Sequence, residues 1–134
     1  MAKFIRHLCL LGLTLVPLLL TACQSSEASK FTGVYQAVLP SAETAGRRLT
    51  LTLDADNSAT VANDFMDGQP PVVDAGDWSE AGDTVTVRLT ERNGEPRPET
   101  ATVTFQLFED RLFVTAFEPA GYLPSVGVQL KKIR

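Results

Sequence analysis

From residue 31 onward the chain alternates apolar and polar residues in short runs, and this pattern limits the possible folds more than any other feature. The clearest run is Arg48–Leu53, in which three leucines alternate with polar residues, as in a strand with one buried face. Similar runs predict further strands over 31–39, 59–65, 72–79, 84–89, 101–107, 112–117 and 126–131. Short strands separated by turn residues predict an all-β fold, a small antiparallel β-barrel of about eight strands.

The apolar positions of these runs predict a filled barrel. Eight strands enclose just enough space for side chains or for one small ligand. Tyr35 and Trp78 are expected in the core, and large residues are expected to fill the interior at Leu49, Leu51, Val85, Val87, Phe105 and Leu107. This packing weighs against the alternative function of binding a small apolar ligand inside the barrel. The segment 90–99 is expected to be a polar loop with its tip at Asn93-Gly94.

A different kind of segment precedes the barrel. Lys3 and Arg6 make a positive start, and the apolar run 8–20 is shorter than the roughly 20 residues that a membrane-spanning helix needs. A positively charged start, a short apolar core and small residues before the cleavage site are typical of a secretory signal peptide. Residues 1–22 are therefore expected to be a signal helix that is cleaved between Ala22 and Cys23.

The sequence at the end of this segment, Leu20-Thr21-Ala22-Cys23, resembles the bacterial lipobox. The resemblance implies that Cys23 becomes the first residue of the mature protein and carries palmitate-type acyl chains. Each buried CH₂ contributes about 0.8 kcal/mol, so two or three chains hold a protein on a membrane stably. Residue 24 is glutamine. Aspartate at this position would resemble an inner-membrane retention signal, so its absence implies a location in the outer membrane, facing the periplasm. Residues 23–30 are then a lipidated flexible tether, and residues 31–134 are the barrel.

Charge and cysteine content exclude several classes of function. The net charge of the chain is −4, and cleavage would remove two basic residues, which argues against nucleic-acid binding. Cys9 lies in the leader and Cys23 is the lipid site, so no disulfide is expected and the core must stabilise the domain. The single histidine, His7, is also in the leader, which excludes a histidine-assisted serine nucleophile in the mature protein. We expect a monomer with no catalytic residue, no metal and no cofactor.

Several short motifs, taken in order, resemble the N-terminal domain of the NlpE outer-membrane lipoproteins. They are Gly33-Val34-Tyr35, the loop 39–46, Leu49–Leu53, Gly76-Asp77-Trp78 and the closing segment 128–131. The resemblance implies a small lipocalin-like β-barrel, linked in that family to copper resistance and to envelope-stress and surface sensing. It covers nearly the whole chain after the leader.

The loop 39–46 departs from the family pattern at two positions. The family has a Leu-Pro-Cys-x-x-Cys-x-Gly loop, and its two cysteines fall at Ser41 and Thr44 of this chain. Thiolates are what make such a loop a site for a soft metal or for redox chemistry, and hydroxyl groups cannot replace them. Copper binding therefore does not carry over to this chain with the fold.

Acidic residues suggest two further sites, each with a simpler interpretation. The segment Asp54–Ser58 looks like part of a calcium loop, but the positions that require glycine and glutamate hold Ala59 and Phe65, so we expect a hairpin turn. Asp64, Asp67, Asp74 and Asp77 could bind a cation or a basic partner, and a solvated acidic loop is the favoured interpretation.

Aromatic residues near the C-terminus are the candidates for contact with a partner. Phe113 and Phe117 are expected on the strand face opposite Leu112, Val114 and Ala116. The loop 118–125 holds Tyr122 and Leu123 between two prolines. These four residues, Phe113, Phe117, Tyr122 and Leu123, either contact a protein partner or cap the core of the barrel.

Together these observations predict a non-enzymatic outer-membrane lipoprotein that acts in envelope homeostasis or stress sensing through protein contact. An apolar ligand inside the barrel is one alternative. The other is an inhibitor that resembles the small membrane-bound lysozyme inhibitors in size, address and β-architecture.

Overall fold

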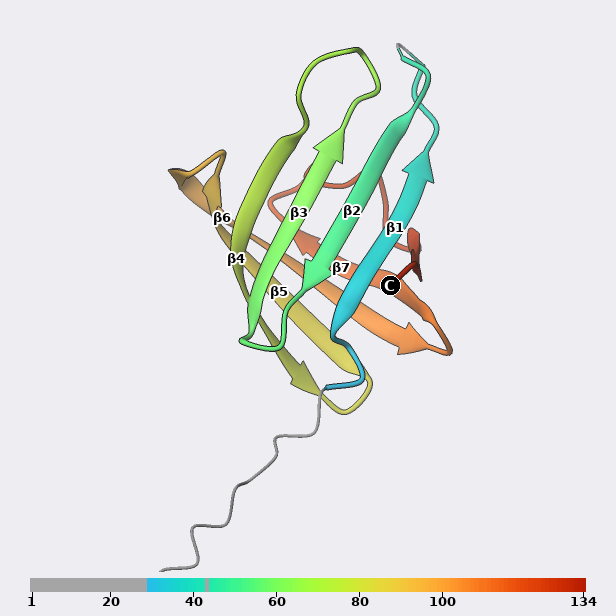
Figure 1. Cartoon of the computed structure of the whole chain (residues 1–134), viewed down its shortest axis with the longest axis vertical. Coiled ribbons are helices and arrows are strands. Elements are labelled where there is room, and N and C mark those ends of the chain that lie inside the picture. The colour runs from blue at the N-terminus through green and yellow to red at the C-terminus, as the bar shows by residue number, and fades with distance from the viewer. Residues whose placement is uncertain (1–28, 43) are drawn as a thin grey trace, which may run out of the picture.

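The chain folds into a closed barrel of eight antiparallel strands that follow one another around the wall (Figure 1). The computed structural model describes residues 29–42 and 44–134. The strands are β1 Gly33–Leu39, β2 Arg47–Leu53, β3 Ser58–Asp64, β4 Val72–Ala81, β5 Thr84–Arg92, β6 Glu95–Phe108, β7 Arg111–Glu118 and β8 Gln129–Lys132. Each strand pairs with the next, and β8 pairs with β1. The predicted all-β barrel is confirmed.

The predicted signal peptide 1–22, its cleavage site at Cys23 and the tether as far as residue 28 lie outside the described residues. Within the part of the chain that the structure describes, no helix has the length and apolar character needed to cross a bilayer.

Alternation along the strands produces the core as predicted. In β2 the side chains of Leu49, Leu51 and Leu53 are buried, and Leu51 lies opposite Val61 of β3. The same rule places alternate residues of the other strands inside the barrel, except where register shifts interrupt the alternation. The interior is filled by buried apolar side chains that include Phe31, Tyr35, Trp78, Val85, Val87, Leu89, Val103, Phe105, Leu112 and Leu130. Since these side chains occupy the centre of the barrel, any ligand site must lie nearer to one of its ends.

One end of the barrel is closed by aromatic residues. The Tyr35 hydroxyl donates to the Phe31 carbonyl oxygen at 2.8 Å, and the Phe31 and Trp78 rings meet edge to face. Trp78 Nε1 donates to the Asp54 carbonyl oxygen at 2.9 Å, which ties this end to the β2–β3 turn. The described chain also begins at this end of the barrel (Figure 1).

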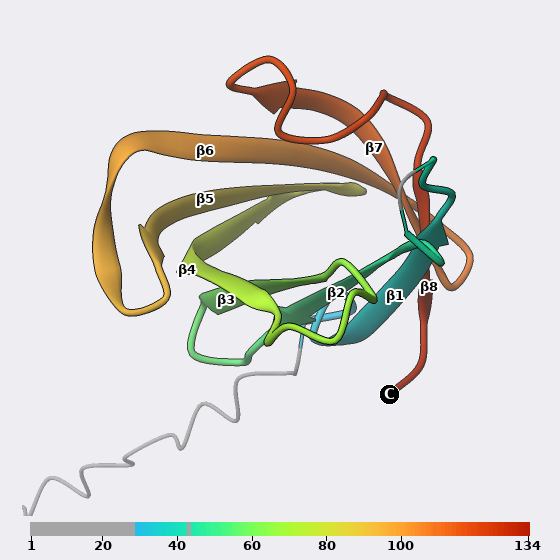
Figure 2. The ribbon, with the colours of Figure 1, turned by 90° about the horizontal axis from the view of Figure 1, so that it is seen from above.

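The segment 90–99 differs from the polar loop that we predicted. Strand β5 continues to Arg92, β6 begins at Glu95, and Asn93 and Gly94 form the turn with φ values of 51° and 81°. Positive φ at both central residues is what a tight hairpin turn requires. The resulting β5–β6 ribbon projects beyond the barrel wall (Figure 2). The sequence did not reveal it because its outer part is polar on both faces and carries two prolines, so the period-two signal is missing.

The last strand is also shorter than predicted. Strand β8 spans Gln129–Lys132, and Val126 lies before it with an exposed side chain. Gly127 has a φ of 85°, which interrupts the alternation between Val126 and Val128. Only Val128 and Leu130 of the predicted inward set enter the core.

Candidate functional site

The four aspartates that the sequence suggested as an acidic cluster have separate roles. Asp64 and Asp77 make surface ion pairs with Arg48 and Arg88, and the Asp67 carboxylate accepts the Gln69 amide. Asp74 is 0% exposed. The prediction of a solvated acidic loop is therefore wrong for Asp74, because the side chain of this β4 residue points into the barrel end.

Asp74 is held by side chains from three other parts of the chain. Arg92 of β5 donates from Nε to Oδ1 at 2.7 Å and from Nη2 to Oδ2 at 3.0 Å. Arg97 of β6 donates from Nη1 to Oδ1 at 2.9 Å, and the Tyr122 hydroxyl donates to Oδ2 at 2.8 Å. A buried carboxylate needs such partners, since an unpaired one would cost several kcal/mol. Asp74 therefore ties β4, β5, β6 and the loop after β7 together at one end of the barrel.

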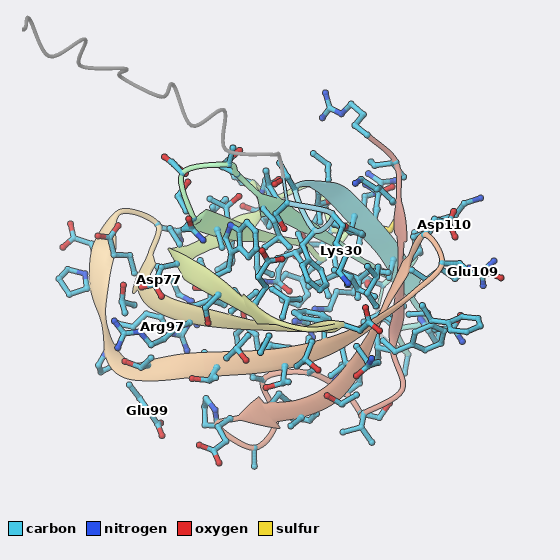
Figure 3. All side chains as sticks on the ribbon, turned by 90° about the horizontal axis from the view of Figure 1, so that it is seen from below. Lys30, Asp77, Arg97, Glu99, Glu109 and Asp110 are labelled. Carbon is cyan, nitrogen blue, oxygen red and sulfur yellow. The ribbon has the colours of Figure 1, made fainter. Side chains whose placement is uncertain are left out.

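An irregularity in β6 lets Arg97 join this group. Leu89 pairs with Ala101, but Glu91 pairs with Pro96, so β6 contains more residues than β5 across this stretch. The extra residues bend β6, with Arg97 on the inner side of the bend and Glu99 on the outer side (Figure 3). The Arg97 side chain is 9% exposed, and its guanidinium lies 5.5 Å from the centre of the Tyr122 ring.

The network changes the pKa values of its members. Burial alone would raise the pKa of Asp74, but hydrogen bonds from Arg92 and Tyr122 and the charges of Arg92 and Arg97 outweigh it and hold the pKa below its usual value. Burial, followed by the neighbouring Asp74 carboxylate, raises the pKa of Tyr122. The site therefore holds a carboxylate that stays ionised and a phenol that stays protonated near neutral pH.

This lowered pKa predicts how Asp74 contributes to acid stability. Because the folded pKa lies below the unfolded value of about 3.9, the contribution is fully present above that value and is lost as pH falls through the folded pKa. We expect the Asp74 carboxyl carbon to titrate below pH 3.9 when followed by NMR. A midpoint at or above that value would contradict the network.

A third arginine lies beside this network without an acidic partner. Arg47, at the start of β2, donates from Nε and Nη2 to the Asn63 side-chain oxygen at 3.0 and 2.5 Å, and from Nη2 to the Tyr122 carbonyl at 3.3 Å. Among the described residues, no carboxylate forms an ion pair with Arg47. Burial lowers the pKa of Arg47. Arg47 is therefore a partly desolvated cation whose hydrogen-bond acceptors, on Asn63 and Tyr122, are neutral.

These side chains surround a cavity of about 440 Å³. Arg47, Arg92 and Arg97 supply its charged groups, and Asn63 and Tyr122 supply further polar groups. Phe65, Val72 and Pro119 contribute apolar surface, and the Arg47 guanidinium lies 5.4 Å from the centre of the Phe65 ring. We call this cavity the arginine mouth. It lies where β2 and β4 begin and β3 ends, which is the barrel end opposite Trp78 and the start of the described chain.

The loop 39–46, which carries two cysteines in the family that this chain resembles, borders the arginine mouth. Thr44 accepts the Gly46 amide at 3.3 Å through its hydroxyl, and the Thr44 amide donates to the Ser41 hydroxyl at 3.3 Å. Both residues line a second hollow of about 350 Å³ that shares Arg47 and Phe65 with the arginine mouth. Among residues 29–42 and 44–134, no three histidine, cysteine, aspartate or glutamate side chains are grouped as a metal site would require.

The hairpin turn predicted at Asp54–Ser58 is confirmed. The Asp54 amide donates to the Ser58 carbonyl at 3.0 Å, and the Asp56 carboxylate accepts the Ser58 amide at 2.9 Å. The turn connects β2 to β3.

The proposed contact residues do not share one surface. A register shift in β7 leaves Thr115 unpaired, so Phe117 lies opposite Val103 and packs against the core. Its predicted position on the face of Phe113 is therefore wrong, because a β-bulge reverses the alternation. Leu123 is 2% exposed and belongs to the core, and Tyr122 packs against it, as the capping alternative describes. Phe113 instead meets the ring of Phe108, which is 63% exposed.

Sequence reasoning missed Arg47, Arg92 and Arg97 as site residues. They lie on three different strands, and no local motif connects them. Arg47 begins β2, Arg92 ends β5 and Arg97 lies near the start of β6, so their positions near strand ends become meaningful only once the register is known.

Comparison with known proteins identifies the family. The profile described as the NlpE N-terminal domain matches residues 35–114. A solved structure from Shewanella oneidensis, described provisionally as a lipoprotein, is 26% identical with a TM-score of 0.50, and the similarity covers 79% of this chain and 92% of that one. No curated protein matches the chain. Because the profile spans more than half of the sequence and the barrel agrees with it, the chain belongs to the NlpE N-terminal domain family.

Proposed function

We propose that the protein is a non-enzymatic lipoprotein, anchored through Cys23 to the periplasmic face of the outer membrane, that acts in envelope homeostasis or stress sensing through contact with a protein partner. The lipobox-like segment 20–23 supports the anchor, and Gln24 supports the outer membrane. Membership of the NlpE family supports the role.

The main support for the proposal is the position of the arginine mouth relative to the start of the domain. The Ser29 hydroxyl donates to Glu80 at 2.6 Å, and Lys30 forms an ion pair with Asp83, so the chain enters beside the β4–β5 turn. The arginine mouth lies at the opposite barrel end. A domain tethered through residues 23–28 therefore holds this mouth away from the membrane, where a periplasmic partner can reach it.

The chemistry of the arginine mouth supports a role without catalysis. Its buried carboxylate, Asp74, is engaged by two arginines and has a lowered pKa, so it makes a poor general base near neutral pH. Tyr122 has a raised pKa and remains a phenol, so it makes a poor nucleophile. Groups fixed in these protonation states are suited to binding rather than to proton transfer.

Substitution of Cys23 by serine tests the anchor and the role together. In a Gram-negative host, we expect the native chain to incorporate labelled palmitate and to sediment with the outer membrane. Cys23→Ser should incorporate no label and should appear in soluble or inner-membrane fractions, because serine has no thiol to acylate. In a deletion strain that carries an envelope-stress reporter, the native chain should restore the response and Cys23→Ser should not.

Cys9→Ser serves as the matched control, since Cys9 lies within the predicted signal peptide and should not affect labelling. The anchor would be disproved by labelled Cys23→Ser, and the outer-membrane address by native protein that sediments with the inner membrane. Equal reporter response in strains with and without the protein would exclude the stress-sensing role.

A further inference from the structure

The arginine mouth has more positive charge than its own acidic residue can balance. Arg92 and Arg97 share the single carboxylate of Asp74, while Arg47 is hydrogen-bonded to neutral oxygen atoms only. Among the described residues that line the cavity, none is acidic. This local excess contrasts with a chain whose net charge is −4. Partly buried cations without counter-charges carry a desolvation cost that an anion in the cavity would offset.

The shape of the groups in the mouth indicates the chemical class of the anion. A guanidinium is planar and presents paired N–H donors that match a carboxylate or a phosphate. Phe65, which is 41% exposed, lies beside Arg47, and Val72 and Pro119 extend the apolar wall. A cavity of about 440 Å³ falls within the roughly 300–1,000 Å³ of small-molecule sites. The polar and apolar walls face the same space, so they suit a ligand with both an anionic group and an apolar group.

We propose that the arginine mouth binds a small organic anion, a carboxylate or phosphate ester, whose charged group is held by Arg47 and Arg92 and whose apolar part lies against Phe65. The Asp74 carboxylate, which Arg97 also contacts, holds Arg92 in place. The ligand enters from the barrel end opposite Trp78 and stays outside the filled interior. This site goes beyond the proposed membrane role and does not depend on the address of the protein.

Titration of the full-length processed protein in a neutral detergent tests the proposal. The probes are benzoate, phenyl phosphate, inorganic phosphate and benzyl alcohol, each followed by isothermal calorimetry. We expect saturable one-to-one binding of benzoate or phenyl phosphate, and the tighter of the two identifies the preferred anionic group. Benzyl alcohol lacks the charge and inorganic phosphate lacks the ring, so each should bind at least tenfold more weakly than that ligand.

Two adjacent arginines provide a matched pair of variants. Arg47→Gln should weaken binding of the better probe at least tenfold, while Arg48→Gln should leave it within twofold, because Arg48 pairs with Asp64 on the barrel surface. Arg47→Lys keeps the charge and should bind more tightly than Arg47→Gln. Circular dichroism of each variant confirms the fold, so a loss of binding in folded Arg47→Gln reports on the site.

Several outcomes would overturn the proposal. They are the absence of saturable binding at millimolar probe, benzyl alcohol or inorganic phosphate binding as tightly as the aromatic anions, and equal effects of Arg47→Gln and Arg48→Gln. None of these outcomes affects palmitate labelling or membrane fractionation, so failure of the anion site is distinguishable from failure of the lipoprotein proposal.

Discussion

Asp74→Asn is expected to lower the free energy of unfolding by about 3 kcal/mol, one of the two largest effects that we expect from a single substitution in this barrel. Asparagine has nearly the same shape, but it removes the negative charge that Arg92 and Arg97 share. The buried Arg97 guanidinium would then have no counter-charge among the described residues. Urea unfolding of a soluble variant that starts at Gln24, followed by fluorescence of the single tryptophan Trp78, measures the loss.

Asp77→Asn is the control for this substitution. Asp77 lies on the same strand, and its ion pair with Arg88 is solvent-exposed, so its loss should cost no more than about 1 kcal/mol. Equal effects of the two substitutions would mean that the buried network contributes no more than a surface ion pair. Such a result would remove the basis for treating Asp74 as the residue that organises the arginine mouth.

Gly76→Ala should also cost about 3 kcal/mol or more, because strand β4 has no room for a side chain there. A Cβ atom on Gly76 would lie 1.8 Å from the Arg88 carbonyl oxygen of β5. The obstacle is backbone, so β4 and β5 must separate for the methyl group to fit. Separation would weaken the ladder next to the register shift between Ala75 and Gly76. The same urea measurement reports this loss.

Gly82→Ala distinguishes this steric effect from the general cost of replacing a glycine. Gly82 has a φ of 61° in the β4–β5 turn, and a Cβ atom there would meet nothing within 4 Å. Its cost should be about 1 kcal/mol, the penalty for placing alanine in the left-handed region. A Gly76→Ala variant that loses no more stability than Gly82→Ala would show that the two strands can move apart at little cost.

The barrel could be predicted from the sequence because its rule is local. In β2 and β5, inward leucine and valine residues alternate with outward polar residues, and this alternation is visible in any short window. Prediction failed where the backbone departs from strict alternation. Thr115 turned Phe117 inward, Gly127 left Val126 exposed, and the polar β5–β6 ribbon carried no apolar signal.

The arginine mouth could not be predicted because it depends on register. Asp74 looks like the other aspartates of its segment, and only the pairing of β4 with β5 brings it opposite Arg92. The bend in β6 that brings Arg97 to the site results from a register shift. The amino-acid composition of the segment does not indicate this shift. The loop 118–125 was correctly suspected of covering a barrel end, yet the sequence did not show that the Tyr122 hydroxyl would hold a carboxylate.

The order of strands around the barrel also has a consequence for how the chain folds. Seven of the eight ladders join strands that are neighbours in the sequence, so each can form as a hairpin soon after its own segment collapses. The remaining ladder joins β1 to β8 through Tyr35↔Lys132 and Gln36↔Lys131. It closes a loop that contains almost the whole domain, which carries the largest entropic cost. We therefore expect the short seam between the first and last strands to form last in folding, and we expect the barrel to close only when the C-terminal residues are present.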